Sequence, residues 1–136
     1  MSERNVQILR DQFEAVNERD FQRAMSHYAE DVELVVSSDG FLQGGTFSGR
    51  EAVGRWFGDW FSTFEPDYVF EIEEARDLGD VVFLDASHRG RGRNSGVEVH
   101  GRTGYLYTFR DGKIARAELF GTPAEALKAA EVDERE

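Results

Sequence analysis

Four side chains in the second half of the chain have types suited to proton transfer or ligand orientation. Asp85 lies in the apolar run VVFLDASH, Tyr105 and Tyr107 lie in GYLYTF, and Glu118 lies in ARAELF. A carboxylate desolvated in an apolar strand has a raised pKa and can act as a general base or acid. A phenol can orient a ligand carbonyl by hydrogen bonding. The structural alternatives are an Asp85 bonded to Tyr105 or an arginine, a solvated or ion-paired Glu118, and two core tyrosines.

Three arginines form a second group. Arg89, Arg91 and Arg93 alternate in SHRGRGRNSG, so they project from one face of a strand. The preceding segment FEIEEARD supplies acids, and cross-strand pairs of opposite charge contribute roughly 0.2–1 kcal/mol each without any ligand. We therefore expect structural ion pairs. An anionic group held at the rim of a pocket is the alternative.

Metal and cofactor chemistry have little support in the sequence. His27, His88 and His100 are scattered, without a carboxylate at ligand spacing. There is no cysteine, which excludes disulfides and thiolate sites. The glycine-rich QGGTFSG lacks the lysine of a phosphate loop and is more typical of a mobile lid. We predict neither a metal nor a cofactor.

The first half of the chain reads as helical with one strand. Apolar residues at helical spacing predict an amphipathic helix over about 3–18, and Asp20 can cap a shorter helix that carries Tyr28 toward the same core. VELVVSS then predicts a strand. Ser48 and Glu51 fit a capping box for a third helix, whose aromatic stripe must be covered: Val53, Trp56, Phe57, Trp60, Phe61 and Phe64.

The second half reads as a sheet followed by a helix. DYVFEIEEARDL, DVVFLDASHRGRGR, GVEVHGRTGYLYTFR and GKIARAELFG alternate like strands and are separated by turn residues, which predicts an antiparallel meander. Thr122, Pro123 and Glu125 then predict a capped helix through Ala130.

The hairpin between the second and third of these strands sets which side chains share a face. A three-residue loop at 94–96 would pair Arg93 with Val97 and place Asp85 opposite Tyr105. Both faces of this ladder would then be largely apolar. Since helices cover only one face, we predict that the second is buried against another copy, giving a homodimer.

Length and charge limit the classes of protein. A chain of 136 residues is of one-domain size, and we expect a single domain over 1–131 with a frayed acidic tail at 132–136. With 27 acidic against 16 basic residues, the net charge is -11, which disfavours nucleic-acid binding. No segment has the length and apolarity of a membrane span or signal peptide, so we expect no membrane partner and a cytoplasmic location.

The order of elements resembles a known family, as do AVNERDFQRAMSHYAEDVEL, FSGREAVGRWFGDWF, GRGRNSGVEV, FRDGKIARAELF and TPAEALKAA. Over nearly the whole chain it resembles the SnoaL-like polyketide cyclase branch of the nuclear transport factor two-like superfamily. The resemblance implies an α+β fold, with a cone-shaped, curved, antiparallel (mixed) sheet wrapped around three N-terminal helices and a short C-terminal helix. It also implies a pocket at the wide end and, often, a dimer.

This architecture hosts several chemistries, so function must come from the pocket residues. Ketosteroid-isomerase-like chemistry is not supported, because Val36, Gln12 and Gly104 or Tyr105 stand where its acids and tyrosine would be needed. An epoxide-hydrolase-like site would need an Asp-Arg-Asp set, and Asp85 with a nearby arginine matches this set only in part. The nearest candidates for cyclase-like proton transfer are Asp85, Tyr105 and Glu118.

Our leading hypothesis is a protein that binds a small apolar or aromatic molecule in the cone. If it is an enzyme, we expect a cofactor-independent cyclase or isomerase acting on a hydrophobic carbonyl compound. A non-catalytic ligand-binding or dimeric interaction module is the alternative. The side chains expected to contact the ligand are mostly aromatic: Phe13, Trp56, Trp60, Phe83 and Tyr107.

Overall fold

The computed structural model describes residues 2–37, 44–79 and 81–135. The elements follow one another as α1 (Ser2–Asn17), α2 (Phe21–Met25), β1 (Tyr28–Val36), β2 (Gly45–Ser48), α3 (Arg50–Ser62), β3 (Val69–Asp77), β4 (Val82–Arg91), β5 (Glu98–Arg110), β6 (Lys113–Phe120) and α4 (Pro123–Arg135).

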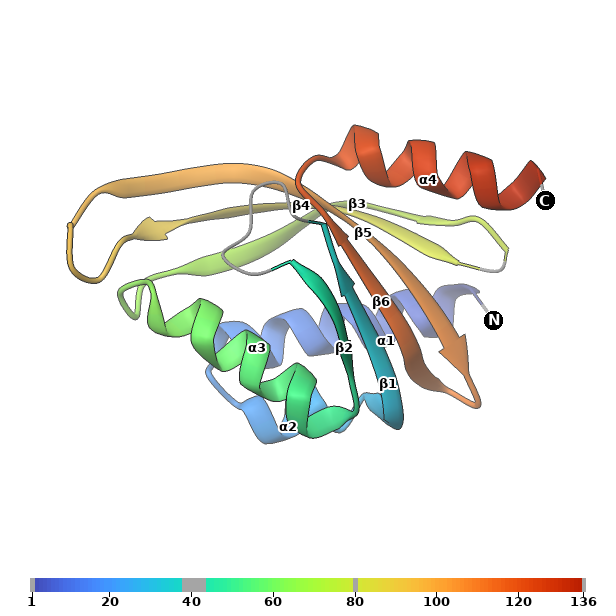
Figure 1. Ribbon diagram of the computed structural model, residues 1–136, viewed down its shortest axis with the longest axis horizontal. Helices are drawn as coiled ribbons and strands as arrows, with labels where there is room; N and C mark the ends of the chain where they lie inside the picture. Colours follow the sequence, from blue (N-terminus) through green and yellow to red (C-terminus); the bar gives the residue numbers. More distant parts are fainter. Residues whose placement is uncertain (1, 38–43, 80, 136) are drawn as a thin grey trace.

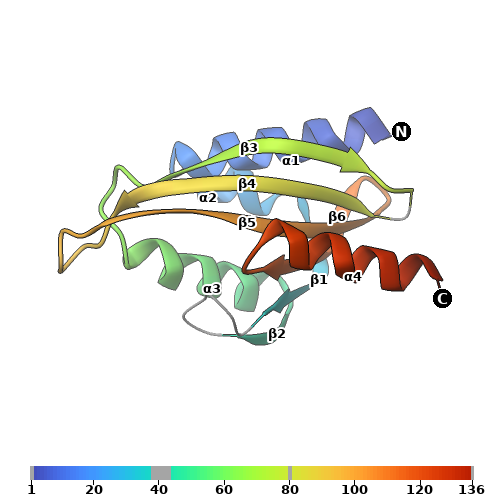
Figure 2. The ribbon, with the colours of Figure 1, turned by 90° about the horizontal axis from the view of Figure 1, so that it is seen from above.

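The strands form one curved sheet in the order β2-β1-β6-β5-β4-β3. Only β1 and β6 pair in parallel, and the other neighbours are antiparallel. The helices α1, α2 and α3 lie on one side of the sheet and α4 lies on the other (Figures 1 and 2). The predicted α+β fold, with a mixed sheet around three N-terminal helices, is confirmed.

The starts of two helices test the capping residues predicted from the sequence. Asp20 caps α2 as predicted, because its carboxylate accepts a hydrogen bond from the Arg23 backbone N–H at 3.2 Å. Tyr28, expected on that helix, instead begins β1. The capping box predicted at Ser48 is wrong: Ser48 pairs with Glu33 at the end of β2, and Gly49, with φ +89°, starts α3 without a side-chain cap. The glycine-rich QGGTFSG, expected as a lid, is for the most part a strand: Gly45–Ser48 form β2 and pair with β1, while Gln43 lies outside the described residues.

The C-terminal helix begins as predicted. The Glu125 backbone N–H donates to the Thr122 hydroxyl at 3.2 Å, and this hydroxyl lies 3.1 Å from the Glu125 carboxylate. The Thr122 hydroxyl thus accepts from the backbone of Glu125 and donates to its carboxylate, and both bonds hold the first turn. The helix continues to Arg135, beyond the expected end at Ala130.

The register of the β4–β5 hairpin differs from the prediction by one residue. The Gly92 N–H donates to the Val97 carbonyl at 3.0 Å, so the turn between them has four residues, with Gly96 at φ +67°. Asp85 therefore pairs with Gly104 instead of Tyr105. Because side chains alternate along a strand, this shift by one residue places Asp85 and Tyr105 on opposite faces.

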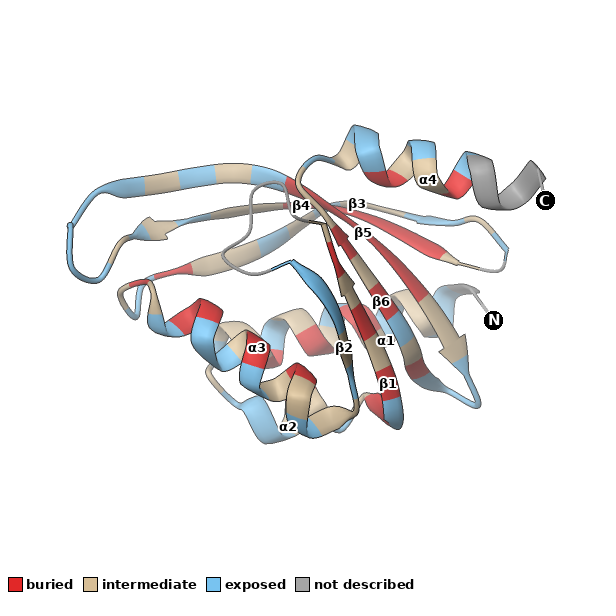
Figure 3. Cartoon of the chain, in the orientation of Figure 1, coloured by how far each residue is buried: buried red, intermediate tan, exposed pale blue. Residues whose placement is uncertain are grey.

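Each face of the central strands has its own apolar cluster. On the inner face, Tyr105 and Tyr107 join a core that includes Leu9 of α1 and Trp56 of α3. On the outer face, a smaller cluster joins the strands to α4: Phe83, Leu106, Ala126 and Ala130. The consecutive buried positions on β4 and β5 show both faces covered (Figure 3). Burial of both faces was predicted correctly, but α4 supplies the cover of this outer cluster.

The edge strand β3 is tied to the end of α1 by one side chain. The Asn17 amide donates to the Phe70 carbonyl at 2.7 Å and accepts from the Phe70 N–H at 2.9 Å. Arg19 adds a hydrogen bond to the Tyr68 carbonyl at 2.7 Å. These contacts fix the first helix against the outermost strand, where it closes one side of the interior.

Contact between α4 and the sheet depends on Gly104. A Cβ atom at this position would lie 2.7 Å from Pro123 Cα and 2.8 Å from both the Thr122 carbonyl oxygen and Ala126 Cβ. Two of these three atoms belong to the backbone, which cannot turn aside as a flexible side chain can. The absence of a side chain at Gly104 therefore allows the first turn of α4 to lie directly on β5.

We expect Gly104→Ala to lower the free energy of unfolding by about 1–3 kcal/mol, because the new methyl group overpacks the α4 contact. Chemical denaturation followed by circular dichroism measures this change. Gly58→Ala is the matched control, since Gly58 is an exposed helical position with open space around its Cβ direction, and it should be stabilising by about 0.5–1 kcal/mol. Equal effects of the two substitutions would contradict the importance of the contact.

Candidate functional site

An apolar cavity lies between the N-terminal helices and the inner face of the sheet. Its volume is about 40 Å³. Helices α1, α2 and α3 and strands β1, β3 and β5 supply its lining: Gln12, Phe13, Val16, Phe21, Ala24, Met25, Tyr28, Phe57, Phe61, Phe70, Tyr105 and Tyr107. No charged side chain occurs among these described lining residues.

Aromatic rings hold the wall of the cavity in place through edge-on contacts. Phe13 meets Tyr105 with ring centroids 5.7 Å apart and meets Phe70 at 6.0 Å, both with nearly perpendicular planes. Tyr105 stacks on Tyr107 at 5.8 Å. Such edge-on and offset pairs are favourable beyond the apolar area they bury. Phe21, at 39% exposure, is the one exposed side chain among the described lining residues and marks where the cavity meets solvent.

Polar atoms reach the cavity from one amide and three phenols. Burial raises the pKa of Tyr105 to about 12, and burial also raises the pKa values of Tyr28 and Tyr107 above the usual range of a phenol. The hydroxyl groups therefore stay protonated near neutral pH and act as hydrogen-bond donors rather than as bases. Tyr105 is already bonded, with its hydroxyl 2.9 Å from that of Thr103.

The predicted ligand-contacting residues separate into three places. Phe13 and Tyr107 line the cavity, together with the proposed catalytic Tyr105. Trp56 and Trp60 are not among its lining; their rings stack on each other at 5.8 Å within the inner core. Phe83 lies on the outer face under α4, because it pairs with Leu106 in the β4–β5 ladder.

Both predicted acids lie on the outer face of the sheet. Asp85 accepts two hydrogen bonds from the Arg102 guanidinium, at 2.8 and 2.5 Å. Glu118 pairs with Leu106 and has a carboxylate oxygen 3.9 Å from Arg116. The structure thus brings neither carboxylate to the cavity that holds Tyr105. A bond between Asp85 and an arginine was the structural alternative, and this is the contact observed.

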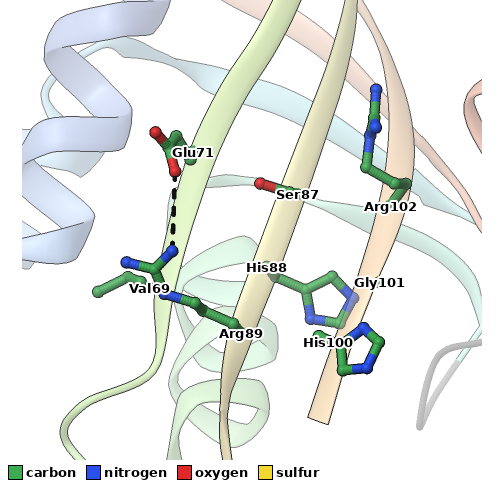
Figure 4. A pocket seen from close by; sticks show the side chains of 8 residues that line it. All are labelled: Val69, Glu71, Ser87, His88, Arg89, His100, Gly101 and Arg102. Carbon is green, nitrogen blue, oxygen red and sulfur yellow. Dashed lines mark ion pairs between the residues drawn. The ribbon is translucent and has the colours of Figure 1, made fainter.

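A second pocket is an open groove of about 260 Å³ across β3, β4 and β5. Figure 4 shows Arg89 turned toward Glu71, while Arg102 points away from that pair. The Arg89–Glu71 distance is 4.0 Å, with both side chains mostly exposed. Since Arg102 also has an acidic partner, the groove lacks the surplus positive charge that would favour an anion.

The three alternating arginines have local partners. Arg89 lies near Glu71, as the strand pattern predicted, whereas Arg91 pairs with Asp67 at 3.3 Å and Arg93 donates to the Ser62 carbonyl at 3.0 Å. All three contacts are exposed, and exposed ion pairs typically contribute little to stability. Pairing with an acid of FEIEEARD is confirmed for Arg89, whereas the partner of Arg91 is an acid that precedes this segment.

A buried chain of hydrogen bonds runs beside the cavity. Trp60 Nε1 donates to the Tyr68 hydroxyl at 3.1 Å, and this hydroxyl lies 2.9 Å from His88 Nδ1. Because the indole can only donate, the Tyr68 proton is available to His88 Nδ1, which fits a neutral imidazole. Burial, and to a lesser extent His100, lowers the pKa of His88 below its usual range.

Two polar lining residues, and all the apolar ones except Phe13, were missed by the sequence analysis as site residues. Gln12 is only 3% exposed and lies on α1 between Leu9 and Val16, on the apolar stripe of the helix. A buried amide on an apolar stripe is the signal that could have identified it. Tyr28 was missed because it was placed on a helix, whereas β1 directs its ring toward the cavity.

The described residues contain no group of three or more side chains arranged to bind a metal ion. None of the helices in the described segments is long and apolar enough to cross a membrane.

Comparison with known proteins agrees with this architecture. A model of the SnoaL-like domain matches residues 9–117. No protein of curated function matches the chain.

Solved structures match over nearly the full chain. A crystal structure of TerC with polyporic acid has 20% identity and TM-score 0.76, covering 93% of this chain and 96% of TerC. A putative SnoaL-like polyketide cyclase from Jannaschia has 19% identity and TM-score 0.77, covering 94% and 91%. A ketosteroid isomerase-like protein from Catenulispora acidiphila, in complex with trimethylamine, has 19% identity and TM-score 0.73, covering 89% of each chain. At these identities the likeness establishes the fold.

The lowered pKa of His88 predicts a pH dependence of stability. The folded state disfavours the proton that the unfolded chain binds near pH 6.5, so the free energy of unfolding should fall as the pH drops through about 6.5 toward 5. We expect His88→Gln to reduce this fall, measured by denaturation at pH 8 and pH 5. His100→Gln should retain most of it, because burial is the larger cause. The same pH dependence in wild type and His88→Gln would contradict the assignment.

Proposed function

The chain belongs to the SnoaL-like domain family, and we propose that it binds a small, mainly apolar or aromatic molecule in its inner cavity. The observation that carries this proposal is the lining itself, which combines aromatic rings with one amide and three phenols and includes no charged side chain among the described residues. A ligand without charge loses little hydration on entering such a site, whereas an ion would be left unpaired.

The size of the cavity implies that side chains move when a ligand binds. A volume of about 40 Å³ is well below the roughly 150 Å³ cavity known to hold benzene. Phe21 and Met25 lie on the short helix α2, and both line the cavity without being fully buried. Methionine is flexible and adapts to differently shaped neighbours. We infer that α2 is the side on which the site opens.

Ligands of proteins with this fold are consistent with such a site. TerC was crystallised with polyporic acid, and the Catenulispora protein is in complex with trimethylamine. Both ligands are small molecules. For this chain, the uncharged aromatic lining favours the neutral aromatic class.

A catalytic role stays a prediction. Proton transfer on a hydrophobic carbonyl compound, with Asp85, Tyr105 and Glu118 as the acting groups, would require both faces of the sheet, because only Tyr105 lines the cavity. Since protonated phenols act as donors at neutral pH, this cavity is better suited to binding and polarising a ligand than to abstracting a proton. We therefore favour the binding function over cyclase or isomerase activity.

Self-association and location stay predictions as well. A homodimer was predicted to bury an uncovered apolar face, but α4 covers the apolar cluster on the outer side of the sheet. A dimer would therefore need to use the more polar part of that face beyond α4. A cytoplasmic location is proposed as well.

Filling the cavity should abolish binding. Ala24 is 2% exposed and lines the cavity from α2, so a larger side chain there would occupy the space. We expect indane, a neutral bicyclic aromatic hydrocarbon, to raise the thermal unfolding midpoint of the wild-type protein. The Ala24→Leu variant should show no such rise, as measured by differential scanning fluorimetry and by nuclear magnetic resonance titration.

Ala52→Leu provides the matched control, because Ala52 lies on α3 outside the cavity lining. This variant should respond to indane as the wild type does. Equal responses of wild type and Ala24→Leu would place the bound indane elsewhere. The absence of any response of the wild type both to indane and to its ketone, 1-indanone, would contradict the proposed function.

A further inference from the structure

One hydroxyl group in the cavity wall has no hydrogen-bond partner within the described parts of the chain. Tyr107 is 2% exposed, and its ring stacks on that of Tyr105. Every fully enclosed side-chain nitrogen or oxygen among the described residues has a partner. The Tyr107 hydroxyl is therefore not fully enclosed by protein and borders the cavity that its residue lines. A nearly buried donor of this kind is costly unless a bound molecule satisfies it.

The other polar groups of the cavity gather at the same end. Tyr28 lies close enough to Tyr107 for its charge to affect the Tyr107 pKa, and the Gln12 amide lies beside the Tyr28 hydroxyl. Tyr105 stacks on Tyr107, but its oxygen accepts a hydrogen bond from the Thr103 hydroxyl, so it has one partner where Tyr107 has none among the described residues. The cavity thus has one polar end, where Tyr107 offers an unused donor, and an aromatic remainder.

We propose that the Tyr107 hydroxyl selects ligands that present a carbonyl oxygen, as in aryl ketones and quinones, while the aromatic lining contacts the rest of the ligand. This inference rests on the proposed function and names the ligand class of the same site. It also makes Tyr107 a specificity-determining residue.

The chemistry of the cavity favours a carbonyl over other oxygen groups. A carboxylate would be buried without a cationic partner, because the described lining contains none. A hydrocarbon would leave the Tyr107 donor unpaired. A neutral carbonyl accepts the hydrogen bond and carries no charge into the interior, so it satisfies the donor at the smallest desolvation cost.

A pair of probes of nearly the same shape tests the proposal. Indane and 1-indanone differ by a carbonyl oxygen, and their dissociation constants can be measured by nuclear magnetic resonance titration of wild type and Tyr107→Phe. We expect Tyr107→Phe to weaken 1-indanone binding about 3- to 10-fold, corresponding to one neutral hydrogen bond, and to leave indane binding unchanged. The aromatic ring is retained, so the stacking on Tyr105 is preserved.

Tyr68→Phe is the matched control. It removes a phenol hydroxyl that bonds Trp60 and His88 outside the cavity lining, so the ratio of 1-indanone to indane affinity should stay at the wild-type value. A readout independent of any variant is the carbonyl carbon-13 shift of 1-indanone bound to wild type, which should lie downfield of its value in water-free hydrocarbon because the carbonyl accepts a hydrogen bond.

The outcomes separate this inference from the proposed function. If both probes bind but Tyr107→Phe leaves their affinity ratio unchanged, or if the bound carbonyl shift stays at its value in water-free hydrocarbon, Tyr107 does not select the carbonyl and a water molecule satisfies its hydroxyl. The proposed binding function would still stand. If neither probe binds to the wild type, both the proposed function and this inference are overturned.

Discussion

The register between β4 and β5 decides which side chains share the interior with the helices. It is set by the Gly92–Val97 hydrogen bond and the four-residue turn it encloses, in which Gly96 takes the positive φ. With this register, Tyr105 and Tyr107 turn inward while Asp85 turns outward to Arg102. A hairpin turn far from the cavity therefore determines that phenols, and not a carboxylate, supply its chemistry.

The uncharged cavity and the charged outer face follow from the same alternation. Along β5, inward positions carry Tyr105 and Tyr107, whereas outward positions carry Leu106 under α4 and, further along, Arg102 bonded to Asp85. The charged Asp85 and Arg102 thus stay where solvent and an opposite charge stabilise them. The polar groups of the described cavity lining are protonated phenols and an amide, which can orient a ligand without offering it a charge.

Much of the fold could be predicted from the sequence because periodicity and turn residues act locally. The helix starts at Asp20 and Thr122 and the four-strand meander were correct for this reason. The site was harder to predict, because its residues depend on the face each strand presents. One extra turn residue reversed Asp85, and the early start of β1 brought in Tyr28. Pairing between distant strands is what the sequence pattern alone could not resolve.

The amide of Asn17 gives the outermost strand a partner made from a side chain. At Phe70 the free edge of β3 has both its backbone donor and its backbone acceptor occupied, as they would be by a neighbouring strand. Exposed strand edges are sites at which chains join into larger aggregates. Asn17 takes the place of one residue of a seventh strand and blocks the addition of a further strand at this point. The contact that holds α1 against β3 therefore also opposes aggregation with other copies of the chain.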